Sequence, residues 1–186
     1  MAIQGGTTDP APGPRLELPA ARWKEEFRRF AEDFLRAGET SNYEWYRRGT
    51  EDFAGYCQEL IANVVGQRLP PGWVPTSTFW MFDAGQLVAA IRVRHRLNAF
   101  LEERGGHIGY DVAPSHRRRG LGRRLLELGL AEARKLGLDR ALLVVDADNA
   151  PSMRIIERCG GVLWDQRSLP GERVPLRRYW IALPGP

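Results

Sequence analysis

The stretch from Val112 to Gly122 reads V-A-P-S-H-R-R-R-G-L-G and leads directly into a helix-like segment, Arg123 to Leu136. An expected strand, a turn rich in arginine and glycine, and a helix start form an arrangement that holds phosphate. The N-terminus of a helix leaves main-chain N–H groups unpaired and carries about half a positive charge, so an anion is stabilised there. Gly120 and Gly122 lack a Cβ, which lets a ligand approach the main chain closely. This turn therefore predicts a strand–turn–helix unit with a phosphate site.

The spacing of the turn excludes two commoner phosphate loops. The pattern G-x-x-x-x-G-K-[ST] fails because neither Lys nor Ser/Thr follows Gly122, and G-x-G-x-x-G fails because Leu125 stands at the third glycine position. The formal net charge is +4, and five arginines fall within eight residues: Arg117, Arg118, Arg119, Arg123 and Arg124. A focused patch suits a compact polyanion such as a nucleotide phosphate better than a long duplex. Nucleic-acid binding is therefore the least favoured use of these arginines.

Length and composition indicate one domain. The chain has 186 residues, of which 43% are hydrophobic and 27% charged, and we expect a flexible tail over 1–14 and a single domain over 15–186. No apolar run approaches the roughly 20 residues that span a bilayer, and the first residues lack the basic start and apolar segment of a signal peptide. We therefore expect a cytoplasmic protein without a membrane partner. Cys57 and Cys159 lie far apart, with no metal-ligand spacing near either, so no metal is expected.

Hydrophobic periodicity predicts both strands and helices along the chain. We expect strands over 15–18, 76–82, 87–94, 107–112, 141–146, 161–166 and 176–183. We expect helices over 23–37, about 43–65 with interruptions near Gly49 and Gly55, 123–136, and from Asn149 to 160. This order describes an α/β (α+β) fold with a mixed, mostly antiparallel sheet of six to seven strands and helices on both faces.

Two motifs agree with this order of elements. Arg117, Gly120 and Gly122 match [RQ]-x-x-G-x-[GA] between a strand and a helix. After the next strand, the pattern N-x-x-[AS]-x-x-x-Y-E-[KR]-x-G-F is matched at Asn149, Ser152, Glu157, Arg158 and Gly160. Together they resemble the GNAT superfamily of acyl-CoA-dependent N-acyltransferases over roughly residues 76–183. The resemblance implies the GNAT fold and acetyl-CoA as cosubstrate.

The resemblance also implies which residues bind the cofactor. Main-chain N–H groups of the glycine turn would hold the pyrophosphate of coenzyme A, at Arg118, Arg119, Gly120, Leu121, Gly122 and Arg123. The pantetheine arm would lie beside the strand at Asp111, Val112 and Ala113, and the N–H of Val112 would stabilise the thioester oxygen as it gains charge. Asn149 and Ser152 would lie near the thioester, although Asn149 is equally well explained as a helix cap.

The sequence departs from the family pattern at the general acid. The tyrosine that commonly precedes the Glu of the second motif is replaced by Ile156. The candidates to replace this tyrosine as general acid are Ser152, Tyr110 and Tyr179, and each also has a structural explanation. An alkyl thiolate, whose thiol has a pKa of about 8.5, also leaves tolerably without an acid.

The general base is a choice among four residues, His107, His95, Asp111 and Asp146. His107 and Asp111 fall on one face of the expected strand, and His is the side chain that titrates near neutral pH. We therefore take His107 as the candidate base, with pairing at the start of a strand as its structural alternative. Asp146, at the end of the next strand, is a candidate holder of the substrate ammonium.

The expected function is an acetyl-CoA-dependent N-acetyltransferase that transfers an acetyl group to a primary amine of a small molecule by direct attack on the thioester. A protein acetyltransferase acting on a lysine or an N-terminus is the near alternative. A non-catalytic acyl-CoA-binding domain is a different one, to which Ile156 lends weight. The acceptor and the acyl chain preference stay open, and a homodimer remains among the expectations.

Overall fold

The computed structural model describes residues 13–67, 69–171 and 173–183, so the expected tail lies almost wholly outside the described residues. Seven strands lie within the described ranges: β1 (Arg15–Glu17), β2 (Thr76–Asp83), β3 (Gln86–Arg94), β4 (Ile108–Val112), β5 (Arg140–Asp146), β6 (Val162–Arg167) and β7 (Leu176–Ala182). The α-helices there are α1 (Lys24–Arg36), α2 (Thr40–Glu51), α3 (Phe53–Val64), α4 (Leu121–Lys135) and α5 (Ala150–Arg158). Short helical turns are η1 (Ala21–Trp23), η2 (Leu101–Gly105) and η3 (Pro114–His116).

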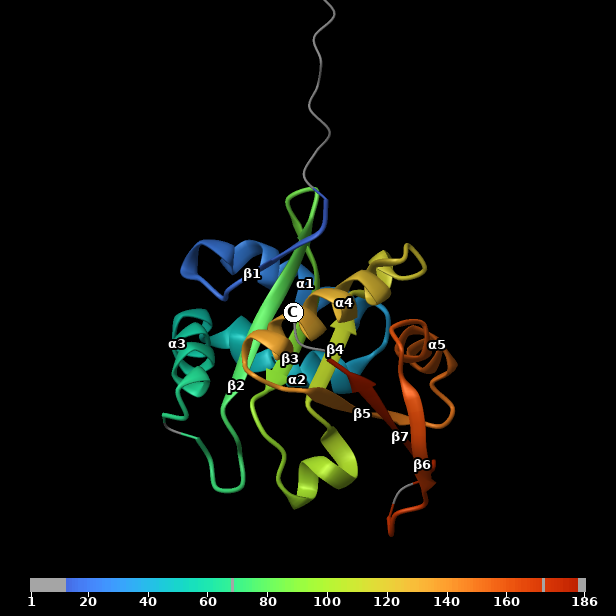
Figure 1. Ribbon diagram of the computed structural model, residues 1–186. Coiled ribbons are helices and arrows are strands. Elements are labelled where there is room, and N and C mark those ends of the chain that lie inside the picture. Colours follow the sequence, from blue (N-terminus) through green and yellow to red (C-terminus); the bar gives the residue numbers. More distant parts are fainter. Residues whose placement is uncertain (1–12, 68, 172, 184–186) are drawn as a thin grey trace, which may run out of the picture.

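The strands form two sheets. One has the order β1-β2-β3-β4 and the other β5-β7-β6, and the paired strands in both are antiparallel. The expected α+β class with seven mostly antiparallel strands is confirmed, with the sheet divided between β4 and β5. Figure 1 shows β4 and β5 running apart in different directions. Just before β4 the chain is joined to β5, where His107 N–H donates to the Leu142 main-chain oxygen at 2.7 Å.

Alternation along β2 and β3 builds a separate core on each face of the first sheet. Met81 and Ile91 pack in a cluster with residues of α4, whereas Trp80 and Phe82 pack with the phenylalanines of α1. Side chains of a strand point alternately to its two faces, so one strand serves both cores. The helices therefore cover both faces of the first sheet, with α4 opposite α1 to α3 (Figure 1).

Two segments differ in detail from their expected form. The helix expected over 43–65 is two helices, because Asp52 breaks it and its side chain accepts a hydrogen bond from Gly55 N–H at 3.0 Å as the N-cap of α3. The loop expected before β4 contains η2, a single turn of π-helix. It ends at Gly106, where φ is +64° and a Cβ would lie 2.4 Å from the Leu142 oxygen. Glycine at 106 therefore permits the close approach of β4 to β5.

Candidate active site

The glycine turn shapes the N-terminus of α4 as the sequence predicts. Gly120 is the N-cap residue of α4 with φ of +78°, and Arg118 has φ of +60°. Left-handed backbone is uncommon for a residue with a Cβ and tends to occur at ligand sites. The first N–H groups of the helix have no acceptor within it, so they are available to an anion. Gly122 has another use, since a Cβ there would lie 2.8 Å from Ile155 Cδ1 of α5.

Several arginine side chains of the turn are engaged with the protein. The guanidinium of Arg117 pairs with both carboxylate oxygens of Glu39, and its Nε donates to the Val112 oxygen at 3.0 Å. The hydrogen bonds that Arg117 donates to Glu39 raise the pKa of Arg117. Arg123 pairs with Glu127 at 2.8 Å, and Arg119 lies 3.7 Å from Asp83. The main chain is therefore the better candidate for phosphate binding, and Arg117 secures the turn to the start of α2.

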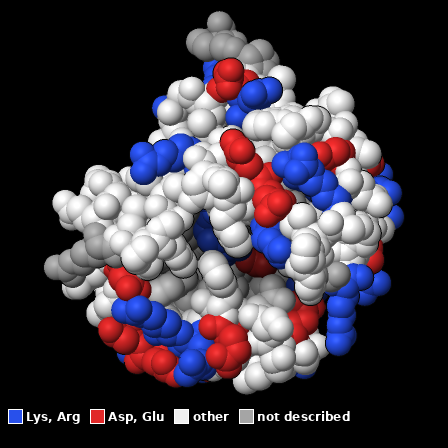
Figure 2. Space-filling model, turned by 90° about the horizontal axis from the view of Figure 1, so that it is seen from below, with Lys and Arg blue, Asp and Glu red and all other residues white. Residues whose placement is uncertain are grey.

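A cavity of about 260 Å³ lies where β4 and β5 separate. Figure 2 shows a hollow on the face seen from below, with basic and acidic side chains deep inside it. Residues of β4, β5, η2 and α5 line the cavity together with one residue each of β3 and β7: Arg92, Arg104, Ile108, Gly109, Tyr110, Leu143, Val144, Val145, Asp146, Asn149, Ser152, Ile156 and Leu176. Asn149, Ser152 and Ile156 of this lining occupy positions of the second motif, and Asp146 lies just before that motif.

The edge of β4 that faces β5 offers main-chain groups to the cavity. Ala113 N–H donates to the Val88 oxygen of β3 at 2.9 Å. Main-chain groups of successive strand residues point to opposite sides, so the N–H of Val112 points away from β3 and toward the separation. This is the direction expected for an N–H that contacts the thioester oxygen. Asp111 and Ala113 point their main-chain groups to β3.

Three predicted site residues meet at the cavity. Asp146 is exposed at the end of β5, and Asn149 and Ser152 begin α5. The Asn149 side chain accepts a hydrogen bond from Ser152 N–H at 3.1 Å, so Asn149 is the N-cap of α5 as well as a lining residue. Ile156 is 1% exposed and lines the same cavity one turn further along the helix.

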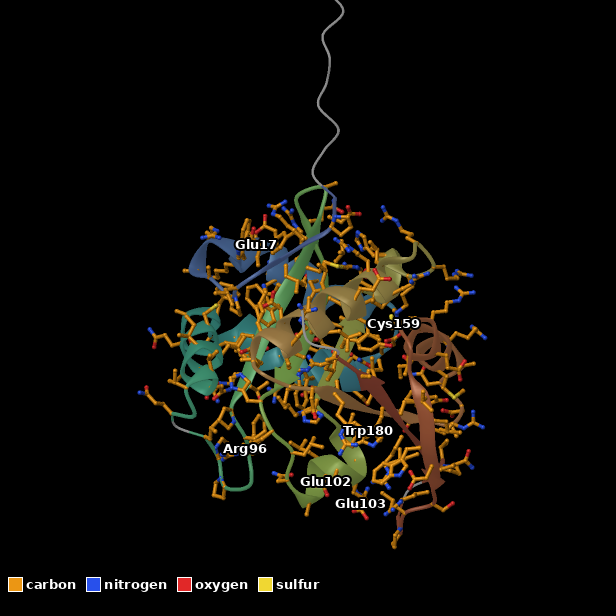
Figure 3. All side chains as sticks on the ribbon, viewed as in Figure 1. Glu17, Arg96, Glu102, Glu103, Cys159 and Trp180 are labelled. Carbon is orange, nitrogen blue, oxygen red and sulfur yellow. The ribbon has the colours of Figure 1, made fainter. Side chains whose placement is uncertain are left out.

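His107 is placed elsewhere. The residue is 6% exposed, and its ring lies 6.1 Å from the ring of Trp180. Its Nδ1 accepts a hydrogen bond from the main-chain N–H of Leu142 at 2.9 Å. Figure 3 shows Trp180 in the lower part of the molecule near Glu102 and Glu103 of η2. Burial, followed by the charges of nearby arginines, lowers the pKa of His107 to about 4. The histidine is neutral at physiological pH and tied into the junction of the two sheets, as its structural alternative anticipated.

Asp111 lies in a polar network on the α1–α2 face of β4. Its carboxylate accepts hydrogen bonds from Asn42 at 3.1 Å, from Tyr46 at 2.7 Å and from the Arg92 guanidinium. Burial lowers the pKa of Arg92, but Tyr46 and Asp111 outweigh it and leave that pKa raised. Arg92 also lies over the ring of Trp45, 5.4 Å from its centroid. The network thus adjoins the cavity through Arg92.

Sequence reasoning missed most of this network. Of its members only Asp111 was a candidate site residue, because neither Tyr46 nor Arg92 belongs to a recognisable local motif. Within the described ranges, no group of three or more His, Cys, Asp or Glu residues is arranged to hold a metal ion. No helix in the described part of the chain is both long and apolar enough to cross a membrane.

The structure has the α+β order of elements implied by the resemblance to acyl-CoA-dependent acyltransferases, with the glycine turn at the N-terminus of α4. The sequence matches the acetyltransferase (GNAT) family over residues 20–161. The chain belongs to this family.

Two curated relatives are mycothiol acetyltransferases. The protein of Geodermatophilus obscurus is 29% identical over 154 residues, which cover 80% of this chain and 47% of that protein. The protein of Thermobispora bispora is 36% identical over 127 residues, covering 64% of this chain and 42% of that protein. The chain therefore spans less than half the length of these relatives.

Solved structures share the fold at low identity. RimJ of Mycobacterium smegmatis in complex with CoA-disulfide has a TM-score of 0.69 at 18% identity, over 91% of this chain and 81% of that chain. YncA, a putative acetyltransferase of Salmonella typhimurium with its cofactor acetyl-CoA, has a TM-score of 0.56 at 16% identity, over 93% and 95% of the chains. The family fold is confirmed, and its solved members include complexes with acetyl-CoA or CoA.

Proposed function

We propose that this chain transfers an acetyl group from acetyl-CoA to a primary amine of a small molecule, by direct attack of the amine on the thioester. The observation that carries this proposal is the cavity between β4 and β5, which joins the open edge of β4 to polar side chains of β5 and α5. The curated relatives are named for mycothiol rather than for a protein acceptor, which favours a small molecule.

The proposed cofactor site runs from the turn into the cavity. Main-chain N–H groups of Arg118, Arg119, Gly120, Leu121, Gly122 and Arg123 hold the pyrophosphate at the start of α4. The pantetheine arm follows the open edge of β4, where the N–H of Val112 is directed. Asn149 and Ser152 lie at the thioester end, where they also line the cavity.

The proposed reaction needs a neutral amine and a stabilised oxyanion. A free alkylamine has a pKa near 10 and is mostly protonated at neutral pH, so it must lose a proton before it attacks. Asp146 at the mouth of the cavity holds the ammonium form, and the proton passes to solvent as the nitrogen approaches the thioester. The N–H of Val112 then donates to the carbonyl oxygen as charge develops on it. His107 has no part in this scheme, because its Nδ1 is already bonded to the main chain.

Binding of acetyl-CoA by isothermal titration calorimetry tests the cofactor site, with a matched pair of glycine variants at the two ends of α4. Gly120 has φ of +78° and Gly137 has φ of +84°, and an added Cβ meets nothing within 4 Å at either. Gly120→Ala and Gly137→Ala should therefore cost similar stability, about 1–2 kcal/mol. Only Gly120→Ala should weaken acetyl-CoA binding, by about tenfold or more, because only its main chain meets the phosphate.

A thiol-release assay over a panel of small amines and peptides tests the acceptor. Release with small amines supports the proposal, and release with peptides alone assigns a protein acceptor. If acetyl-CoA binds but no acceptor releases thiol, the non-catalytic alternative is correct. If wild-type protein does not bind acetyl-CoA, the cofactor site itself is refuted.

A further inference from the structure

Two arginines project from the same face of β3, and their charges are balanced differently. Arg92 and Arg94 are two residues apart on the strand, so their side chains lie on one face of the sheet. Arg92 donates to the Asp111 carboxylate and to the Tyr46 hydroxyl, the latter at 3.0 Å. Within the described part of the chain, no carboxylate forms an ion pair with Arg94. The pair therefore shares one negative charge.

The charge of Arg94 has no partner that requires a cation. Its Nη1 donates to the main-chain oxygens of Gly105 at 3.0 Å and Gly106 at 3.2 Å, and a neutral donor would serve these two carbonyls as well. Burial, followed by the charge of Arg92, lowers the pKa of Arg94 to about 10. The residue is thus still a cation at neutral pH, and a half-buried cation without a counter-ion is unfavourable.

Gly109 leaves open space beside both guanidinium groups. It is the cross-strand neighbour of Arg92 on β4. A Cβ at position 109 would lie 3.7 Å from Arg94 Nη1 and 3.8 Å from Arg92 Nε and Nη2. Gly109 and Arg92 also line the cavity between β4 and β5, and Figure 2 shows basic side chains inside the hollow on this face. A small group placed beside Gly109 would therefore contact both arginines from within the cavity.

The two guanidinium groups retain donors for such a group. Among the described residues, Arg92 Nε and both Nε and Nη2 of Arg94 have no hydrogen-bond partner. None of these three nitrogens belongs to the fully buried polar atoms that lack a partner there, so each keeps some accessible surface. Guanidinium N–H groups match the oxygens of a carboxylate or a phosphate in geometry and in charge.

We propose that the acceptor amine carries a carboxylate or phosphate group, which binds beside Gly109 between the guanidinium groups of Arg92 and Arg94. This inference rests on the proposed function and names the substrate class of that same cavity. Asp146 lines the cavity from the end of β5. The ammonium group of the acceptor lies toward Asp146 and its oxyanion lies toward the arginines, so the acceptor is a small zwitterion.

Isothermal titration of amine probes into protein saturated with coenzyme A tests this inference without turnover. Coenzyme A occupies the glycine turn, so an anionic probe cannot bind there instead. The probes are a series of ω-amino acids of increasing length and O-phosphoethanolamine, each compared with the amino alcohol of the same length. At least one anionic probe should bind about tenfold or more tightly than its neutral counterpart, because hydrogen bonds between charged groups are the strong ones. The kcat/KM of thiol release from acetyl-CoA should show the same preference.

Two variants remove the site in different ways. Arg94→Met removes the charge that has no counter-ion, together with two hydrogen bonds to the main chain. Gly109→Ala keeps both arginines and fills the space between them. Its Cβ would meet its nearest neighbours at ordinary contact distance and without positive φ, so this variant should fold normally. Each variant should weaken binding of the preferred anionic probe by about tenfold or more and change binding of the amino alcohol by less than about twofold.

Arg96→Met is the matched control. Arg96 is exposed in the loop that follows β3 (Figure 3) and does not line the cavity. Its replacement removes the same charge from a nearby position, so it should leave both affinities unchanged. A decrease for the anionic probe equal to that in Arg94→Met would refute the site, because the effect would then be one of net charge.

The remaining outcomes separate this inference from the proposed function. If amino alcohols bind and react as well as the anionic probes, or if no anionic probe binds the coenzyme A complex, the oxyanion site is refuted while the acetyltransferase proposal stands. A preference for anionic probes that persists in both Arg94→Met and Gly109→Ala would also refute the site. If acetyl-CoA does not bind to wild-type protein, the proposed function fails and this inference fails with it.

Discussion

Replacement of His107 by asparagine separates a structural histidine from a catalytic base. The imidazole Nδ1 accepts Leu142 N–H at 2.9 Å, so the neutral ring carries its proton on Nε2. Burial lowers the pKa of His107 from 6.5 to about 4, with Arg94 and Arg140 contributing and Asp139 opposing. Asparagine retains an oxygen able to accept the same N–H but does not titrate. His107→Asn should therefore change how stability depends on pH more than stability at neutral pH.

The sign follows from proton uptake. Below pH 6.5 the unfolded chain binds a proton at this histidine, whereas the folded protein does so only near pH 4. The unfolded state therefore binds more protons in this window, and His107 makes the fold less stable as pH falls through it. A shift from 6.5 to about 4 limits the effect to about 3 kcal/mol. Between pH 7.5 and pH 5 it amounts to about 2 kcal/mol.

Urea denaturation at a series of pH values measures this contribution. From pH 7.5 to pH 5 the wild-type protein should lose about 2 kcal/mol more of unfolding free energy than His107→Asn. If both proteins lose the same amount, the reasoning from burial is refuted. The pH profile of kcat/KM supplies a second criterion: loss of a limb near pH 6.5 in His107→Asn would restore the histidine as the catalytic base.

Three further substitutions test the network, the junction and the helix cap. Asp111→Asn leaves the buried guanidinium of Arg92 without its counter-charge, so it should lower the free energy of unfolding in urea by about 2–4 kcal/mol. Adding Arg92→Met should recover much of this loss, and purely additive losses would contradict the pairing. Gly106→Ala combines strain at positive φ with contact on a main-chain oxygen of β5, so it should lower the free energy of unfolding by about 2–4 kcal/mol, clearly more than Gly137→Ala. Equal melting temperatures of the two variants would show that the contact between Gly106 and β5 is not tightly packed. Asn149→Ala should cost about 1 kcal/mol in thermal unfolding, whereas Asn149→Asp keeps a capping oxygen and should cost little; equal losses in the two variants would argue against the cap.

Local patterns predicted the elements of the fold well. Turn residues and periodicity placed the strands that became β2, β3, β5 and β7 within one or two residues. Periodicity failed to predict a helix boundary where a single side chain ends one helix and begins the next. Asp52 ends one helix and caps the next, and the apolar stripe continues through both helices, so periodicity alone could not show the break.

The division of the sheet could not be read from strand patterns. Each strand was identifiable, but whether β4 and β5 pair along their length depends on how two sheets twist and meet. Alternation also failed for His107, because His107 lies between the positive-φ Gly106 and the start of β4 at Ile108, outside the regular strand. His107 therefore does not share the environment of Asp111.

The sequence by itself determined the two motifs behind the family resemblance, the glycine turn and the cap at Asn149, because each of these is a local pattern of neighbouring residues. Only the tertiary structure decided which polar groups meet at the cavity. Arg92 and Tyr46 reach Asp111 across 19 and 65 residues of chain, and Tyr110 lies near Ser152 only because β4 and α5 pack together. Contacts between distant segments carry no local signal. The glycine turn thus predicts where the proposed cofactor site lies, and the packing of the two sheets decides which residues line the cavity beside it.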